Sequence, residues 1–107
     1  MIRRVKGTQD FLDLTLFDFI ITTISRHLSR YHFTHITTPI IEHTELFKRS
    51  LGQQTDVVSK EMFTLETRSQ DDDGMCLRPE ATASIARAFV ENGIQTTPWK
   101  VWTWGPM

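Results

Sequence analysis

The chain has 107 residues, of which 39% are hydrophobic and 23% charged, with a net charge of −1. These values are typical of one small soluble domain, and they exclude a strong overall attraction to nucleic acid or to an anionic membrane. The single cysteine, Cys76, cannot form an internal disulfide, which indicates a reducing compartment. No run approaches the roughly 20 apolar residues of a transmembrane helix, so the composition predicts a cytoplasmic protein without a membrane partner.

The N-terminal third contains the clearest helical pattern. Residues 1–13 are expected to form a short strand and a loop, with a turn at Gly7. A helix follows over 15–31, and Thr15-x-x-Asp18 matches a capping box at its start. Its apolar face consists of Phe17, Ile20, Ile21, Ile24, Leu28 and Tyr31. The simplest interpretation places this face in the core, although a partner subunit could also cover it.

The middle of the chain alternates strand and helix patterns. Residues 33–41 predict a strand, and Pro39 belongs at its end or edge because proline lacks the N–H that a strand donates. Residues 44–51 predict a short helix with Thr44 as a possible cap and Gly52 as its stop. We expect Leu46, Phe47 and Leu51 to be the buried side chains of this helix.

The C-terminal half predicts a hairpin, a helix and a last strand. Residues 61–68 and 75–77 form the hairpin, because Asp-Gly at its connection is a strong turn signal. Residues 80–92 form the helix, with Asn92-Gly93 as its stop and Ala83, Ile85, Ala86, Phe89 and Val90 facing inward. Residues 99–104 form the strand. The predicted fold class is therefore α/β (α+β), with a sheet that is at least partly antiparallel.

One corner of the chain carries the best candidate for chemistry. Glu80 and Thr82 lie where the strand at 75–77 turns into the helix, a common place to hold a small polar ligand. A carboxylate there can accept strong hydrogen bonds from a ligand ammonium group. The structural alternative is that Glu80 only complements the helix dipole and that Thr82 bonds its own backbone.

Other polar clusters indicate no site. The four histidines have no metal-ligand spacing, and the three aspartates at 71–73 suit a solvated loop tip better than a cation. Cys76 lies in an apolar strand, which favours a buried small hydrophobe over a nucleophile. We therefore expect no metal site within this segment.

Four stretches together resemble histidyl-tRNA synthetase, a class II aminoacyl-tRNA synthetase. RRVKGTQDF is similar to the family's opening, and the stretch from PIIEHTELF to FTLETR is similar to its first class motif and the segment after it. LRPEATA resembles the histidine-contacting stretch, and WKVWTWGPM resembles the strand that begins the second motif. The resemblance identifies 1–107 as the N-terminal part of the catalytic domain, with a mainly antiparallel, incomplete sheet flanked by helices.

The resemblance also implies functional roles. Glu80, Ala81 and Thr82 would bind the substrate histidine, with Glu80 taking its α-ammonium group, and Pro39 would lie in a homodimer interface together with helix 15–31. The family activates histidine with ATP, which Mg²⁺ accompanies, and transfers it from the adenylate to tRNA. Positioning and charge stabilisation suffice for this reaction without a protein nucleophile.

Three departures and two alternatives accompany the resemblance. The chain stops at Met107, before the second-motif arginine, so the 107 residues alone are expected not to activate histidine. Ala81 replaces the family's usual glycine, and Thr103 occupies a position that is often tyrosine. The alternatives are a synthetase-like regulatory subunit of histidine biosynthesis without ligase activity, and a stand-alone interaction domain that dimerises through helix 15–31.

Overall fold

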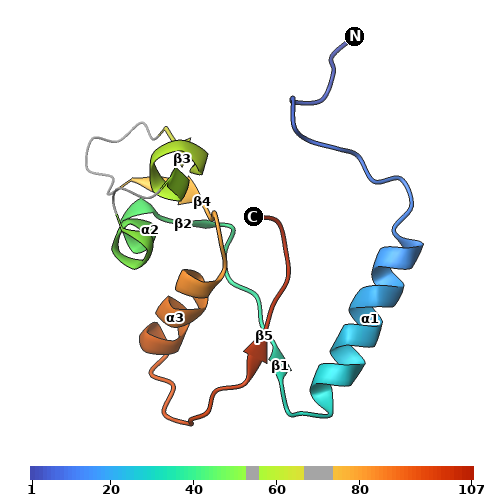
Figure 1. Cartoon of the computed structure of the whole chain (residues 1–107), viewed down its shortest axis with the longest axis vertical. Helices are drawn as coiled ribbons and strands as arrows, with labels where there is room; N and C mark the ends of the chain where they lie inside the picture. Colours follow the sequence, from blue (N-terminus) through green and yellow to red (C-terminus); the bar gives the residue numbers. More distant parts are fainter. Residues whose placement is uncertain (53–55, 67–73) are drawn as a thin grey trace. The chain divides into compact units, whose positions relative to one another are not determined.

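The computed structural model describes residues 1–52, 56–66 and 74–107. The chain divides into two compact units, residues 1–34 and residues 35–107, and each is described here by itself (Figure 1).

The first unit consists of an extended segment and one helix, α1 (Thr15–Ser29). The helix confirms the predicted pattern, but the strand expected within residues 1–13 is wrong, because these residues form only a turn and extended chain. The turn at Gly7 is confirmed: its φ is +89°, and Thr8 donates its N–H to the Val5 carbonyl oxygen at 3.1 Å.

The start of α1 differs from the predicted capping box. The residue before the helix is Leu14, and Asp13 supplies the side-chain contact instead, since its Oδ1 accepts the Thr15 N–H at 2.8 Å. Hydrogen bonds from Thr15, first from its side chain and then from its backbone, lower the pKa of Asp13. Asp13, two residues before Thr15, therefore provides the capping contact that was expected from Thr15 and Asp18.

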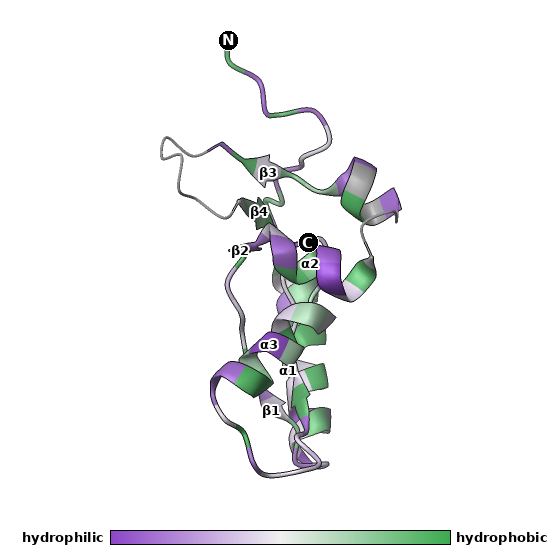
Figure 2. Ribbon diagram, turned by 90° about the vertical axis from the view of Figure 1, so that its left-hand side faces the viewer, coloured by the Kyte–Doolittle hydropathy of each residue, from purple (hydrophilic) through white to green (hydrophobic). Residues whose placement is uncertain are grey.

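Within the first unit, the apolar face of α1 is exposed. No residue of the helix is buried, and Phe17, Ile20 and Ile24 are 41%, 45% and 39% exposed. Apolar residues recur along α1 in Figure 2. Both interpretations of this face, a place in the core and a covering partner, stay predictions.

Residues of the second unit, together with Thr34 at the boundary, form two small sheets. Strands β2 (Ile41–His43), β4 (Met75–Leu77) and β3 (Thr64–Leu65) form one antiparallel sheet in the order β2-β4-β3. Pairing of Thr64 with Cys76 confirms the predicted hairpin, although most of its connection lies outside the described residues. Strands β1 (Thr34–His35) and β5 (Val101–Trp102) form the other sheet.

The strands expected at 33–41 and 99–104 are shorter than predicted. Pro39 lies between β1 and β2, which agrees with its inability to donate to a strand neighbour. Next to β1 and β5, Ile36 donates its N–H to the Trp102 carbonyl oxygen at 3.0 Å, and the rings of His35 and Trp102 stack with centroids 4.2 Å apart.

Helices α2 (Thr44–Leu51) and α3 (Thr82–Glu91) cover the core, and a π-helix spans Val57–Glu61. The core consists of Phe47, Cys76 and Ala83, with Leu46, Leu51 and Met62 packed against it. The predicted α2 is confirmed, including Gly52, whose φ of +84° suits a helix stop; the cap position, however, is His43 and not Thr44.

The inward face of α3 differs in part from the prediction. Ala83 is buried as expected, and Asn92 and Gly93 end the helix. Ala86 and Val90 are exposed, which contradicts the prediction, and Ser84 is buried in their place. Ala83 and Ser84 are the buried positions of the helix, and Arg87 pairs with the buried carboxylate of Glu42 on β2.

A corner between a strand and a helix

The predicted ligand corner lies between β4 and α3. At the end of β4, Leu77 donates its N–H to the Phe63 carbonyl oxygen and Arg78 donates its N–H to that of Ile40, both at 2.8 Å. Pro79 has no N–H to continue the sheet, so the chain leaves it there. The helix then begins at Thr82 (Figure 1). Strand pairing on one side and the helix on the other thus hold Glu80 in place.

The Glu80 carboxylate contacts the beginning of the helix. Its Oε2 accepts the backbone N–H of Thr82 at 2.5 Å, and its Oε1 accepts that of Ala83 at 2.9 Å. It therefore satisfies two N–H groups that a helix start leaves without a partner. A carboxylate has about four acceptor positions, so these two bonds orient Glu80 without using all its capacity. Glu80 thus has the structural role at the helix start that was considered as an alternative. Its role in binding histidine stays a prediction.

Ala81 and Thr82 complete the predicted set by lying directly after Glu80. Ala81 occupies the cap position with φ −103° and ψ −21°, a conformation open to any L-residue. The backbone there does not require the glycine usual in the resembling family. Thr82 is exposed, so its side chain is accessible from solvent.

Arg78 was not predicted as a functional residue, yet it is the most connected side chain near the corner. It is 4% exposed. Its Nη1 donates to the Thr38 carbonyl oxygen at 3.1 Å and to Thr38 Oγ1 at 2.9 Å, and its Nε donates to the Pro106 carbonyl oxygen at 3.1 Å. An arginine directly after an apolar strand and before a proline was the sequence signal that could have revealed it.

A buried ion pair joins the sheet to α3. Glu42, whose side chain is 5% exposed, accepts from Arg87 Nη2 at 2.6 Å, and Glu91 accepts from Arg87 Nη1 at 2.5 Å. The hydrogen bond to Glu42 is the main reason that the pKa of Arg87 is raised. Sequence reasoning missed this pair because its members are 45 residues apart.

Pro39, the predicted interface residue, is exposed and borders a cavity of about 260 Å³. The lining is completed by Ile41, Glu42, His43, Met75, Arg87 and Glu91. The residues of the corner, 80–82, do not line this cavity.

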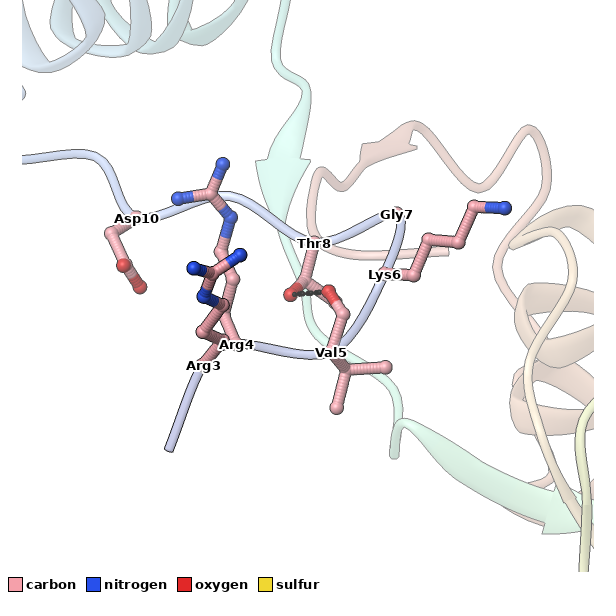
Figure 3. Close-up of a pocket in the computed structure, with 7 residues that line it drawn as sticks. All are labelled: Arg3, Arg4, Val5, Lys6, Gly7, Thr8 and Asp10. Atoms are coloured by element: carbon pink, nitrogen blue, oxygen red, sulfur yellow. Dashed lines mark hydrogen bonds between the residues drawn. The ribbon is translucent and has the colours of Figure 1, made fainter. Parts of the chain in front are cut away.

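The first unit has two cavities of its own. One, of about 540 Å³, lies along the N-terminal segment, and its lining includes Arg3, Arg4 and Lys6 (Figure 3). The other, of about 430 Å³, is apolar and lies along the start of α1, lined by Phe11, Asp13, Leu14, Leu16, Phe17 and Ile20.

Among residues 1–52, 56–66 and 74–107, no three metal-ligating side chains gather into a group. The aspartates at 71–73 lie outside the described residues. None of the helices in the described part of the chain has the length and apolar character to cross a membrane.

Comparison with known proteins places these features in context. No protein-family model matches the chain. It is 46% identical over 110 residues to the histidine–tRNA ligase of Neorickettsia sennetsu, covering 99% of this chain and 26% of that protein. It is 41% identical over 111 residues to the ligase of Thermosipho africanus, covering 100% of this chain and 26% of that protein.

Solved structures give the same result for the fold. The apo histidyl-tRNA synthetase of S. aureus superposes with a TM-score of 0.78 at 32% identity, covering 100% of this chain and 25% of that one. A Bacillus halodurans protein named as an ATP phosphoribosyltransferase regulatory subunit/histidyl-tRNA synthetase has a TM-score of 0.72 at 21% identity, covering 96% of this chain and 26% of that one. This similarity supports the fold alone. The chain spans about a quarter of the length of the proteins it matches, and over that quarter it is related by sequence and by fold to the histidine–tRNA ligases.

Proposed function

We propose that residues 1–107 form the N-terminal part of a histidine–tRNA ligase catalytic domain and contribute the corner that binds the amino group of histidine. The observation that carries this proposal is the state of Glu80. Two backbone N–H groups hold its carboxylate at the strand-to-helix corner, and acceptor positions remain for the donors of an ammonium group. The relationship to histidine–tRNA ligases supports the same assignment.

The reaction follows from the proposed family. Histidine attacks the α-phosphate of ATP through its carboxylate, giving histidyl-adenylate and pyrophosphate, and the adenylate then esterifies the 3′ end of tRNA. Glu80 would fix the amino group, so that the carboxylate points to the nucleotide. Ala81 would lie beside the ligand through its backbone and Thr82 through its hydroxyl. Catalysis by such a site consists of alignment, which is worth several kcal/mol of the barrier.

Further partners belong to the same proposal. ATP, with Mg²⁺ accompanying its phosphates, and tRNA would be the other substrates, and the protein would act in the cytoplasm. A homodimer would form through α1 and the region of Pro39, in agreement with the exposed apolar residues of α1.

The alternative of a regulatory subunit has weaker support. The curated relatives with more than 40% identity are named histidine–tRNA ligases, whereas the Bacillus halodurans protein, whose name includes a regulatory subunit, is 21% identical. No comparable observation favours the regulatory role.

A chimera tests the proposal directly. Residues 1–107 replace the matching quarter of the Neorickettsia sennetsu ligase, and histidine-dependent ATP–pyrophosphate exchange is measured. A second chimera with the matching quarter of the Thermosipho africanus ligase shows whether such a replacement is tolerated. We expect exchange activity from both chimeras. Activity from the second chimera only would contradict the proposed function.

A further inference from the structure

Arg78 connects three segments that are distant in the sequence. Through its side chain it contacts Thr38, which precedes β2, and Pro106, which follows β5; through its backbone N–H it contacts Ile40. It also lies two residues before Glu80, so all of these contacts are made beside the corner. The chain after β5 thereby returns to the junction of β4 and α3 (Figure 1).

Burial of the Arg78 guanidinium group costs desolvation free energy, which is a high cost for a side chain that only fills space. A buried charge normally requires a counter-ion, and among the described residues Arg78 has no carboxylate partner within ion-pair distance. Its partners are two carbonyl oxygens and one hydroxyl. The planar guanidinium group directs several donors at fixed angles, so it can hold two segments in one relative position, whereas an apolar side chain of similar volume would fill the space without that geometry.

Gly105 lies very close to the Arg78 guanidinium group. A Cβ atom at this position would lie 2.5 Å from Arg78 Nη2, too near without displacement of one of the two groups. The guanidinium is held by its other bonds. A side chain at position 105 would therefore move the segment or break those bonds.

We propose that Arg78 is a positioning residue that fixes residues 105–107 against the Glu80 corner, so that these residues form the opposite wall of the same site. This inference rests on the proposed function for its kinetic consequence. Glu80 is held independently by the first N–H groups of α3. Loss of the Arg78 contacts therefore displaces the wall and leaves the histidine amino-group contact in place.

The kinetic test uses Arg78→Lys in the active chimera, which keeps the charge and loses the planar fork. We expect kcat for pyrophosphate exchange to fall about 100-fold, the loss that a misplacement of about 1 Å produces, and the KM for histidine to change less than about threefold. Arg49→Lys on α2, where the side chain is 80% exposed, is the matched control and should change neither. An Arg78→Lys variant with unchanged kcat, or with its loss confined to KM, would overturn the inference.

Two further variants address the individual contacts. Thr38→Val removes the Oγ1 acceptor and should reproduce part of the kcat loss, while Thr37→Val at the exposed neighbour should not. Gly105→Ala should lower kcat in the presence of Arg78 and have a smaller effect in an Arg78→Met background, where Nη2 is absent. Equal effects of Gly105→Ala in the two backgrounds would show that Arg78 does not hold that segment.

A structural measurement tests the role of Arg78 separately from the proposed ligase function. Backbone amide NMR resonances are compared for the 107-residue chain with and without Arg78→Lys. We expect the amide resonances of Gly105 and Met107 to shift, because the Pro106 carbonyl between them loses its hydrogen bond from Arg78 Nε, while those of Thr82 and Ala83 stay in place. This result would stand even if the chimera lacked ligase activity, and unchanged resonances at 105 and 107 would refute the proposed Arg78 contact whatever the activity.

Discussion

Glu42 on β2 and Arg87 on α3 form the one described ion pair in which a carboxylate is almost completely removed from water. Their N–O distance is 2.6 Å, and the two side chains are 5% and 27% exposed. The two elements that this pair joins both adjoin the Glu80 corner: β2 pairs with β4, which leads into the corner, and α3 begins there. The relative position of the sheet and the helix therefore depends on this contact as well as on the apolar core.

Removal of one partner of this pair should be destabilising. Glu42→Ala leaves the Arg87 guanidinium without its buried partner, and we expect the free energy of unfolding to fall by about 2–3 kcal/mol, toward the lower end for a buried pair because Arg87 is partly exposed. Urea unfolding of the chain measures this value. The exposed pair of Glu45 and Arg49 is the control, since Glu45→Ala should cost about 0.5 kcal/mol or less. Equal costs for the two variants would show that burial adds nothing to the Glu42 contact.

The two roles of Glu80 can be separated by two substitutions. Glu80→Gln keeps one neutral oxygen for one of the two helix N–H groups, and loses both the second acceptor and the charge that attracts an ammonium group. We expect the free energy of unfolding to fall by about 0.5 kcal/mol, and the KM for histidine in the chimera to rise about 10- to 100-fold, the value of a charge-assisted hydrogen bond.

Glu80→Ala provides the comparison, because it removes the cap as well. Its free energy of unfolding should fall by about 1 kcal/mol, and its KM should rise at least as much as that of Glu80→Gln. If Glu80→Gln bound histidine as tightly as the parent chimera, the carboxylate would be a helix cap and nothing more.

The sequence predicted local features well, since their causes are local. The helices at 15–29 and 44–51 follow from apolar periodicity, and the hairpin follows from two strand-like runs joined by Asp-Gly. The stops at Gly52 and Gly93 follow from the freedom of glycine at positive φ.

The wrong predictions concern positions whose burial depends on residues far away in the sequence. The Glu42–Arg87 pair joins β2 to α3, and Arg78 bonds to Thr38 and Pro106, so both contacts link residues far apart in the sequence. Periodicity within one helix contains no information about these partners. The Glu80 corner was found because its strand, proline and helix start are consecutive, but its hydrogen bonds to Thr82 and Ala83 required the structure.

Cys76 should be protected from reaction. It is fully buried, and this burial raises the pKa of its thiol. The thiolate is the reactive form, so we expect a thiol reagent to modify the native chain much more slowly than the urea-unfolded chain. Equal rates in the two states would contradict the buried position.

The same pKa shift has a defined effect on stability. Because the folded chain holds the thiol proton more tightly than the unfolded chain, stability is fully present below the ordinary thiol pKa of about 8.5 and falls as pH rises above it. The difference between the parent chain and Cys76→Ala should therefore shrink with rising pH in that range. A difference that is constant with pH would mean that the thiol ionises equally in both states.

The apolar face of α1 should bind a second copy of the chain. Ile20 and Ile24 are 45% and 39% exposed, and an apolar cavity of about 430 Å³ lies along the start of the helix. Contiguous apolar surface of this kind typically marks an interface. We expect the molar mass of the chain in sedimentation equilibrium to rise from 12.5 kDa toward twice that value with concentration. Ile20→Asp or Ile24→Asp should keep it monomeric, whereas Thr22→Asp, at an exposed polar position of the same helix, should not. A folded parent chain that stays monomeric at high concentration would refute both the dimer and the α1 interface, because the surface proposed to associate is already present in these 107 residues.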